Sequence, residues 1–310
     1  MTDAAPYYLD CDTGVDDALA LALLLAHPAV DLLAAGTVSG NTAAGQAARN
    51  TLDLLALGGR ADVPVAVGAA HPLGGTFAGG APHVHGGNGI GGVDLPTATR
   101  QPDARSAVDL LLDLAHAYAG RLRIVATGPL TNLALALERE PDLPELIRDV
   151  TVMGGAVRVP GNITPRAEFN IACDPRAAAA VLGARWPLTL VPLDVTLRHC
   201  FDEDDRAALL AKGTPLTSAL GQMLTAYLNH YEAVSRDRRV PLHDPLAVGI
   251  ATGDLRALDA PSLGLRVEAD GHLIEDPSAP TTTRVVRSLT ADAAPTIRTL
   301  LTSTPSNHRR

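Results

Sequence analysis

The chain has 310 residues, 46% of them hydrophobic, and its formal net charge at pH 7 is −9. Lys212 is the only lysine, and no basic run or basic-aromatic patch occurs, which argues against a nucleic-acid-binding protein. This length and apolar content allow one large core, so we expect residues 1–310 to form a single α/β domain.

Cysteine usage and the N-terminal segment bear on the compartment. Cys11, Cys173 and Cys200 show no paired spacing, so we expect reduced thiols in a cytoplasmic protein rather than disulfides or a zinc site. Residues 1–8 are acidic and lack the basic start of a signal peptide. The apolar run at 18–26 is too short to span a bilayer and predicts a buried helix, so we expect no membrane partner.

Short apolar runs alternate with longer Ala/Leu-rich stretches along the chain. The short runs predict strands at 6–10, 31–38, 63–67, 121–126, 149–153 and 187–193. The longer stretches predict helices at 16–27, 42–57, 104–118, 130–139, 175–183, 203–211, 215–235 and 244–252. The tail predicts strands within 263–269 and 281–289 and a last helix near 291–302. This alternation predicts an open, mostly parallel, Rossmann-like sheet flanked by helices, with extra strands and helices at the C-terminal end.

Residues 74–92 are rich in glycine and show no helical or strand periodicity. They contain G-x-G-x-x-G at Gly87, Gly89 and Gly92, but a dinucleotide fingerprint needs a strand before it and a helix after it. Neither is predicted here. The segment is therefore interpreted as a mobile loop or lid.

Polar residues gather where the predicted strands end. In open α/β sheets, ligands bind beyond the carboxyl ends of the strands, so these residues predict a pocket at one edge of the sheet. They are Asp10 and Asp12 at the first strand, Ser39, Gly40 and Asn41 at the second, Thr127 and Gly128 at the fourth, Met153, Gly154 and Gly155 at the fifth, and Asp194 at the sixth.

Asp10, Asp12, Asp16 and Asp17 fall within eight residues, and no lysine or arginine precedes Arg49. Asp16 and Asp17 stand where the first helix should begin, and carboxylates there are favoured by free N–H groups and the helix dipole. Capping does not account for the other two. Two unit charges about 4 Å apart repel by about 4 kcal/mol at an effective dielectric of about 20. The cluster therefore needs protons, distant arginines or a divalent cation, and oxygen ligands favour Ca²⁺ or Mg²⁺.

The spacing of these aspartates does not match an EF-hand. The stretch D-C-D-T comes close to the D-x-D-x-T pattern of haloacid dehalogenase-type phosphatases, which need a lysine or arginine at the phosphate. The only lysine, Lys212, lies at the end of a predicted helix, but an arginine could bind the phosphate in its place. A Mg²⁺-dependent phosphatase therefore stays an alternative.

The segment DCDTGVDDALAL at 10–21 resembles the D-x-D-x-G-x-D-D signature of the inosine-uridine preferring nucleoside hydrolases. Six further segments resemble motifs of that family, in the same order. They are VSGN (38–41), HGGNGIGG (85–92), ATGPLTNLA (126–134), VMGGA (152–156), GNITPRAEFNIACDPRAA (161–178) and PLHDPLAV (241–248). Together they extend over most of the chain, so the resemblance is not confined to one motif.

The resemblance implies one Ca²⁺ at the bottom of the pocket. Its ligands would be Asp12, Asp17, the backbone carbonyl of Thr127, and Asp244. Water and two ribose hydroxyls would complete a shell of about six to eight oxygens. Asp10 would brace the motif without binding the metal.

The reaction implied by the resemblance is hydrolysis of the N-glycosidic bond of a ribonucleoside to ribose and free base, through an oxocarbenium-like transition state. A bound cation lowers the pKa of water, and Asp12 would act as general base. Because a deoxyribose would leave part of the sugar site unsatisfied, we expect discrimination against it. The substrate-binding residues would be Asp16, Asn41, Met153, Asn162 (at the 5′-hydroxyl), Glu168 and Asn170.

The departing base must gain a proton or have its charge stabilised, and the resemblance assigns this role to His243. His85 would approach the base from the other side, whereas His83 is expected at the surface. Tyr227 and Tyr231 lie one helical turn apart in the predicted helix. Aromatic residues here close over the base in family members, and packing on the core is the alternative.

Several positions depart from the family pattern. Thr13 stands where proline is frequent, Ser39 where alanine is frequent, and 267–277 lacks the usual Thr-Arg-Gly. Purine-specific members stack the base between tryptophans, but Trp186, the only tryptophan, lies away from the motifs. The resemblance therefore implies a pyrimidine-preferring or broad enzyme.

A protein that binds nucleosides or ribose without cleaving them is a third alternative. The resemblance further implies a ribonucleoside as the small-molecule partner, a homodimer or homotetramer, and a role in nucleoside salvage. A binder could lose the catalytic and metal positions, yet all are present: Asp12, Asp16, Asp17, Asn170 and Asp244.

Overall fold

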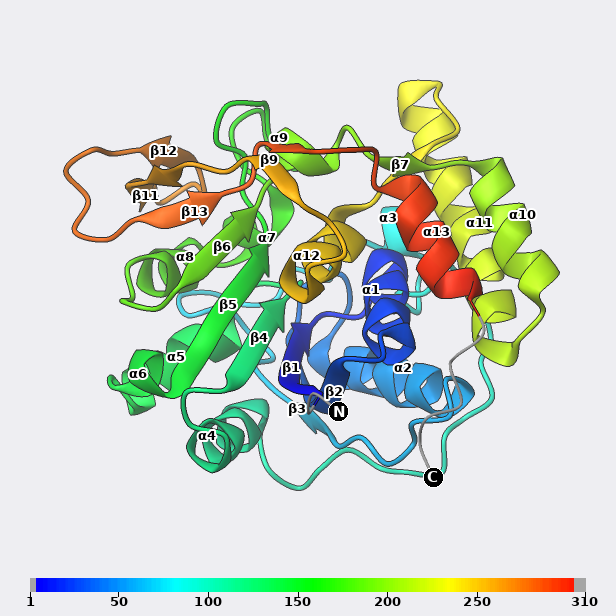
Figure 1. Cartoon of the computed structure of the whole chain (residues 1–310), viewed down its shortest axis with the longest axis horizontal. Helices are drawn as coiled ribbons and strands as arrows, with labels where there is room; N and C mark the ends of the chain where they lie inside the picture. The colour runs from blue at the N-terminus through cyan, green and yellow to red at the C-terminus, as the bar shows by residue number, and fades with distance from the viewer. Residues whose placement is uncertain (1–3, 304–310) are drawn as a thin grey trace.

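An eight-stranded sheet runs through the middle of the molecule, as the computed structural model of residues 4–303 shows (Figure 1). Residues 1–3 and 304–310, at the two ends of the expected domain, lie outside the described residues. The strands, in spatial order, are β10 (Ser262–Leu263), β13 (Thr283–Val285), β6 (Leu188–Val191), β5 (Ile147–Met153), β4 (Leu122–Ala126), β1 (Ala5–Cys11), β2 (Val30–Thr37) and β3 (Val65–Val67). Only β10 runs antiparallel to its neighbour, which confirms the predicted mostly parallel sheet.

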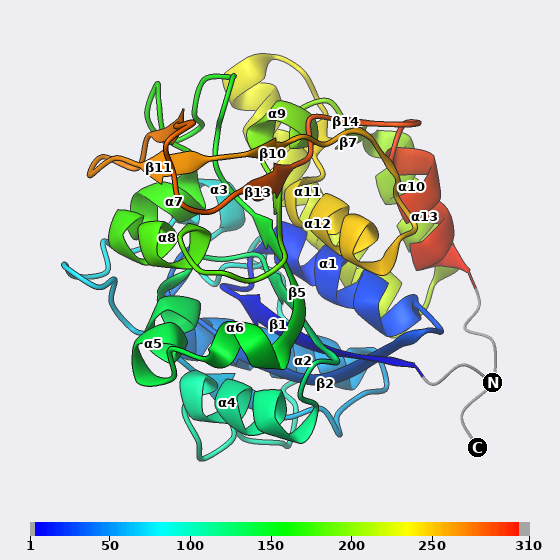
Figure 2. The ribbon, with the colours of Figure 1, turned by 60° about the vertical axis from the view of Figure 1, so that its left-hand side comes forward.

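Helices cover both faces of the sheet (Figure 2). One face carries α1 (Val15–Ala26), α2 (Ala44–Leu57) and α12 (His243–Thr252). On this side α11 (Pro215–Ser235) and α13 (Ala294–Thr302) pack on α1, and α10 (Glu203–Lys212) packs on both of them. The other face carries α4 (Ala107–Ala117), α5 (Thr131–Arg139), α6 (Leu143–Leu146) and α8 (Pro175–Leu182).

The alternating side chains of β1 divide the core between these layers. Tyr7 and Leu9 pack on the α1 side, and Tyr8 packs on the α4 side. Helix α1 lies between the sheet and the outer helices, so every residue from Val15 to Leu24 is buried, as its apolar sequence predicts. Among residues 4–303, no helix combines the length and apolar content needed to cross a membrane.

Several short elements were not predicted from the sequence, and two of them show that a predicted loop and a predicted strand end were wrong in part. The glycine-rich segment is not wholly a loop, because Pro82 occupies a first-turn position of a single-turn helix, α3 (Pro82–His85), where its missing N–H costs nothing. The strand predicted at 187–193 ends at Val191. Pro192 then opens α9 (Leu193–Thr196), so Asp194 lies in a helix rather than at a strand end.

The remaining short elements are one helix and three two-stranded sheets. They are α7 (Phe169–Cys173), β7 (Cys200–Phe201) with β8 (Val240–Pro241), β9 (Ala257–Asp259) with β14 (Ser288–Leu289), and β11 (Leu265–Val267) with β12 (Leu273–Glu275). The two tail strands expected within 263–269 and 281–289 are thus divided into shorter pieces.

Gly36 in β2 allows a close approach to Tyr8 of the neighbouring strand. The Tyr8 hydroxyl donates to the Ala107 carbonyl (3.1 Å), and a Cβ at position 36 would lie 1.9 Å from that hydroxyl. We expect Gly36→Ala to lower the free energy of unfolding by about 1–3 kcal/mol, because the added methyl overpacks this buried site. Urea denaturation followed by circular dichroism measures the change.

Gly45→Ala is the matched control, because no atom lies within 4 Å of a Cβ at this position of α2. The same methyl should there be neutral or stabilise by up to about 1 kcal/mol through helix propensity. Equal effects of the two substitutions on the unfolding midpoint would contradict the steric argument.

Candidate active site

A cavity of about 290 Å³ opens at the carboxyl-terminal edge of the sheet, where β2 and β3 continue the sheet on one side of β1 and β4 to β6 on the other. Such a reversal of strand order is where open α/β sheets bind ligands. Twelve of the fourteen predicted site residues line this cavity, and Asp12 and Asp17 do not. The twelve are Asp16, Asn41, His85, Thr127, Met153, Asn162, Glu168, Asn170, Tyr227, Tyr231, His243 and Asp244.

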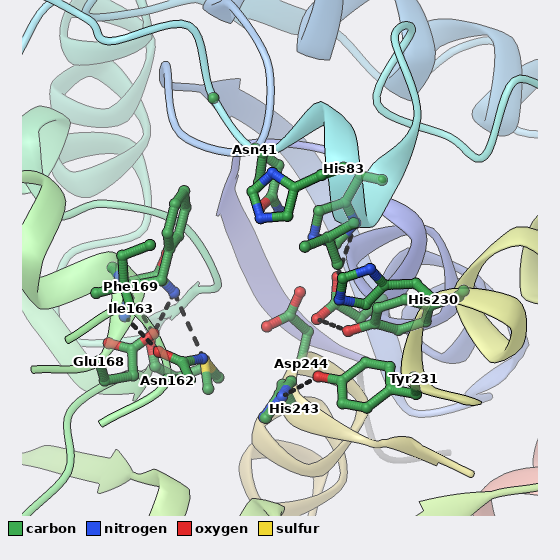
Figure 3. A pocket seen from close by; sticks show the side chains of 18 of the residues that line it. Asn41, His83, Asn162, Ile163, Glu168, Phe169, His230, Tyr231, His243 and Asp244 are labelled. Carbon is green, nitrogen blue, oxygen red and sulfur yellow. Dashed lines mark hydrogen bonds and ion pairs between the residues drawn. The ribbon is translucent and has the colours of Figure 1, made fainter. Parts of the chain in front are cut away.

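Three buried carboxylates meet at the floor of the cavity, which Asp16 and Asp244 line. Asp16, Asp17 and Asp244 each offer an oxygen within 4.8 Å of the others, the one such group of three or more metal-ligating side chains in the described part of the chain. In Figure 3 the Asp244 carboxylate points into the space between Glu168 on one side of the cavity and Tyr231 on the other. Burial raises the pKa of Asp16 to about 6, and burial together with the neighbouring carboxylates raises the pKa of Asp244. The Asp16 Oδ1 atom is buried without a hydrogen-bond partner.

Asp12 is fully buried and is not among the residues that line the cavity. The backbone N–H of Asn41 donates to its Oδ2 (2.6 Å), and the Asn41 carboxamide donates to both Asp12 Oδ1 (3.3 Å) and Asp17 Oδ2 (3.2 Å). A Cβ at Gly40 would lie 2.0 Å from Asp12 Oδ2, so glycine lets the chain approach this closely. Asn41 therefore joins two carboxylates, and its NH₂ group is directed at them. Burial, and then the charge of Asp17, raise the pKa of Asp12.

Thr127 and Asn132 fasten the aspartates to β4 and α5. The Thr127 hydroxyl donates to Asp17 Oδ1 (2.7 Å), and its backbone N–H donates to the Asp10 carbonyl (2.8 Å). Asn132 donates to Asp10 Oδ1 (2.8 Å). Asp10 thus braces the segment from beneath, and burial raises its pKa to about 7. Asn132 was not singled out from the sequence, although it lies within the quoted segment ATGPLTNLA.

Glu168 and Asn170 line the cavity, and Figure 3 shows Glu168 on the wall opposite Tyr231. The Glu168 carboxylate begins α7 by accepting from the backbone N–H of Asn170 (2.9 Å), and it also accepts from Gly155 (2.8 Å). The Asn170 NH₂ group donates to the Thr127 carbonyl (2.8 Å). Asn162 lies at the exposed rim of this wall. The buried pair is therefore held rigidly by backbone groups.

His243 and two tyrosines form the opposite wall. His243 Nδ1 lies 2.8 Å from the Thr196 hydroxyl, and its Nε2 lies 3.5 Å from the Tyr231 hydroxyl. Burial lowers the pKa of His243 to about 4. The Tyr227 hydroxyl donates to Asp16 Oδ2 (3.4 Å), and its ring packs edge-to-face on Tyr231 at 5.3 Å. Each tyrosine therefore belongs both to the core and to the cavity wall.

Three histidines surround the mouth of the cavity. His85 is buried, accepts from the Val15 N–H (3.2 Å) through Nδ1, and packs its ring on Tyr227 at 5.4 Å. Burial lowers the pKa of His85 to about 4. His83 is exposed, as expected from the sequence, but it also lines the cavity and packs edge-to-face on His230 at 5.9 Å.

The mouth also carries apolar side chains that sequence reasoning missed. Ile163 and Phe169 lie within the quoted segment 161–178, so that motif was the available signal. Leu197 and Val234, 44% and 65% exposed, come from segments without such a signal. None of the cavity-lining residues in the described part of the chain is a lysine or arginine. A phosphate group would therefore find no cationic side chain on this lining.

Comparison with known proteins agrees with this geometry. Residues 7–296 match the family described as inosine-uridine preferring nucleoside hydrolase. The chain belongs to this family. It is therefore an N-glycosyl hydrolase, and the resemblance drawn from the sequence motifs is confirmed.

Relatives of this nucleoside hydrolase cover most of its length. The pyrimidine-specific ribonucleoside hydrolase RihA of Enterobacter sp. (strain 638) is 39% identical over 246 residues, 79% of this chain and 78% of the relative. RihA of Shewanella sp. (strain MR-7) is 39% identical over 244 residues, 78% of this chain and 76% of the relative.

Solved structures share the whole fold. The purine-preferring ribonucleoside hydrolase of Gardnerella vaginalis superposes with a TM-score of 0.91 at 30% identity, covering 96% of this chain and 98% of that one. The plant nucleoside hydrolase PpNRh1 superposes with a TM-score of 0.91 at 27% identity, covering 97% of this chain and 100% of that one. The extra C-terminal strands and helices are therefore included in the shared fold.

The carboxylate floor makes a prediction about metal binding that needs no activity assay. We expect Ca²⁺ to raise the thermal unfolding midpoint by roughly 5 °C or more at saturation, because a bound cation removes the repulsion among the buried carboxylates. Asp244→Asn should lose most of this rise. Differential scanning fluorimetry with and without Ca²⁺ measures both.

Asp142→Asn removes an exposed carboxylate at the start of α6 and should keep the full response. The metal assignment fails if Asp244→Asn responds to Ca²⁺ as the wild type does. The choice of calcium fails if Mg²⁺ raises the midpoint equally.

Proposed function

We propose that this nucleoside hydrolase cleaves ribonucleosides to ribose and free base at a Ca²⁺ site, with Asp12 as general base, and that it prefers pyrimidine nucleosides or accepts both classes. The observation that carries the proposal is the convergence of Asp16, Asp17 and Asp244 on a cavity whose opposite walls present Asn170 and His243. This arrangement supplies oxygen ligands at the floor and a nitrogen donor on the wall.

The donor set fits a hard cation. The three carboxylates are buried, and no lysine or arginine among the described residues lines the cavity beside them. Within residues 4–303, Asp16 Oδ1 also has no hydrogen-bond partner. Ca²⁺ would neutralise such a group of oxygen ligands. Asp12, Asp17, the Thr127 carbonyl and Asp244 would hold it. The Thr127 carbonyl accepts one hydrogen bond from Asn170 and retains a second lone pair for a metal. When bound, Ca²⁺ supplies positive charge that acidifies water and fixes sugar hydroxyls.

Asp12 is held for proton transfer by its two hydrogen bonds from Asn41. These bonds fix the orientation of the carboxylate, which a general base needs in order to accept a proton from one direction. Asp12 then accepts a proton from the attacking water. The sequence predicted that Asn41 binds ribose, whereas in the structure it donates hydrogen bonds to this carboxylate.

The sugar would lie between the carboxylate floor and the wall of Glu168 and Asn170. Because the Asn170 NH₂ group donates to Thr127, its amide oxygen is the atom left to accept a ribose hydroxyl. Asp16, Met153 and Asn162 complete the proposed sugar site, with Asn162 nearest the rim. The anionic groups beneath the ring would stabilise positive charge that develops as the glycosidic bond breaks.

His243 would serve the departing base. Its lowered pKa leaves the imidazole neutral at pH 7, so it stabilises the base as a hydrogen-bond donor. Tyr231 lies beside Nε2, and His85 and Tyr227 flank the same side of the cavity. These aromatic groups offer flat apolar surface to a base.

Preference for the base is supported by two observations. The relatives at 39% identity are named pyrimidine-specific, whereas the Gardnerella structure at 30% identity is named purine-preferring. Trp186 is buried beneath α8, donates to the Val181 carbonyl (3.0 Å) and does not line the cavity. Tryptophan stacking on a purine is therefore not supported.

The two alternatives to hydrolysis of nucleosides find less support. A Mg²⁺-dependent phosphatase would need a cation for the phosphate, and the described cavity lining supplies none. A non-catalytic binder would not need Asp12 oriented by two hydrogen bonds. A cytoplasmic homodimer or homotetramer acting in salvage belongs to the proposal through the family resemblance, and light scattering of the purified protein tests the oligomer.

The first prediction of this proposal concerns Asp12. We expect ribose release from at least one of uridine, cytidine, inosine and adenosine, and a loss of kcat of about a hundredfold or more in Asp12→Asn, because the amide cannot take the proton. A reducing-sugar assay measures release. Prolonged chelation should abolish activity and added Ca²⁺ should restore it.

Asp142→Asn again serves as the control and should retain wild-type kcat. Release by Asp12→Asn at the wild-type rate would exclude Asp12 as the base. Absence of release from all four nucleosides by folded, Ca²⁺-loaded protein would overturn the substrate assignment.

The second prediction concerns the sugar. We expect kcat/KM for 2′-deoxyuridine to fall about a hundredfold or more below that for uridine, because the missing hydroxyl leaves buried oxygen partners unsatisfied. Paired initial-rate measurements at equal enzyme concentration give the ratio. A ratio near one would contradict recognition of the 2′-hydroxyl by this site.

A further inference from the structure

Thr196 is a buried threonine that the sequence did not single out. It is the last residue of α9, its side chain is fully buried, and its hydroxyl lies 2.8 Å from His243 Nδ1. Among residues 4–303 this is the only hydrogen bond that the Thr196 side chain makes. The hydroxyl therefore has one partner, a ring nitrogen.

This single bond decides which ring nitrogen carries the proton. A buried hydroxyl has one hydrogen to donate, and leaving it without an acceptor costs about 1–3 kcal/mol. Donation from Thr196 to Nδ1 requires Nδ1 to be the unprotonated nitrogen of the neutral ring. Nε2 then carries the hydrogen. Figure 3 shows His243 beside Tyr231, and the Tyr231 hydroxyl is the partner 3.5 Å from Nε2.

Helix α9 is fixed firmly enough to set the orientation of the ring. The Leu193 N–H donates to the Gly155 carbonyl (2.9 Å), and the Asp194 carboxylate accepts the backbone N–H groups of Val157 and Arg158 (2.9 Å each). The residue before His243 is bonded to the same region. The Leu242 N–H donates to the carbonyl of His199 (2.9 Å), three residues beyond the end of α9.

We infer that Thr196 is a positioning residue for departure of the base: its hydroxyl holds His243 in the Nε2–H tautomer with that N–H directed into the cavity. The inference rests on the proposed function, in which His243 faces the leaving base. Within the described part of the chain, the ring is the one group to which this hydroxyl bonds. Thr196 should therefore matter for leaving groups that need a hydrogen-bond donor and not for those that depart unaided.

The test compares two substrates in Thr196→Val, which keeps the shape of the side chain and removes the hydroxyl. With the fastest nucleoside of the four, kcat should fall about tenfold to a hundredfold while KM stays within about twofold. With 4-nitrophenyl β-D-ribofuranoside, whose leaving group departs as a stable anion, kcat should stay within about threefold. Thr196→Ser should retain activity on both substrates.

Thr252→Val is the matched control, since it removes a hydroxyl that bonds to the Val248 carbonyl at the far end of α12 (3.0 Å). Equal losses on both substrates in Thr196→Val would show a merely structural role and overturn the inference. Unchanged rates on the nucleoside, or failure of Thr196→Ser to retain activity, would overturn it as well.

A second readout does not depend on activity. Long-range ¹⁵N–¹H spectra of the wild type should show His243 as the Nε2–H tautomer, with its signal assigned by its loss in His243→Gln. An Nδ1–H tautomer in the wild type would overturn the inference even if Thr196→Val failed to fold. Wild-type protein that cleaves neither substrate would overturn the proposed function, and the wild-type spectrum would still decide whether His243 is the Nε2–H tautomer that the bond to Thr196 requires.

Discussion

Mutual repulsion among buried carboxylates is the constraint around which this nucleoside hydrolase is organised. Asp12, Asp16, Asp17 and Asp244 lie together at the end of β1 and the starts of α1 and α12. Burial raises the pKa of each, and the charges of neighbouring carboxylates raise it further for Asp12, Asp17 and Asp244. Such a group opposes folding unless its charges are compensated. Backbone and amide donors compensate part of it, and the proposed cation would compensate the rest.

The fold holds these carboxylates in place from several sides. Asn41 joins Asp12 to Asp17 from the loop after β2, and Thr127 reaches Asp17 from the end of β4. Parallel strands make this possible, because their carboxyl ends lie at one edge and deliver loops from distant parts of the sequence to one place. The apolar layers on the two faces of the sheet keep that edge rigid.

The opposite wall of the cavity follows a different design. His243 starts α12, yet its ring is oriented by α9 on one side and α11 on the other, through Thr196 and Tyr231. The carboxylate floor and the histidine wall are thus supported by separate elements. The proposed division of labour, with the floor acting on water and sugar and the wall acting on the base, matches this separation.

The sequence by itself determined the alternation of strands and helices, the parallel sheet and the family. Each depends on local periodicity or on motifs of adjacent residues, such as the eight-residue aspartate segment. It also indicated which strand ends carry polar groups. These features survive without coordinates because side chains at fixed spacing share one face or one turn.

Only the tertiary structure decided which groups meet. It brought Asp244 to Asp16 and Asp17, directed the Asn41 amide at carboxylates, and brought Thr196 to His243 across 47 positions of the sequence. It also placed Leu197 and Val234 at the mouth of the cavity. No spacing rule predicts such contacts, because they depend on how elements far apart in the sequence pack together rather than on any segment alone.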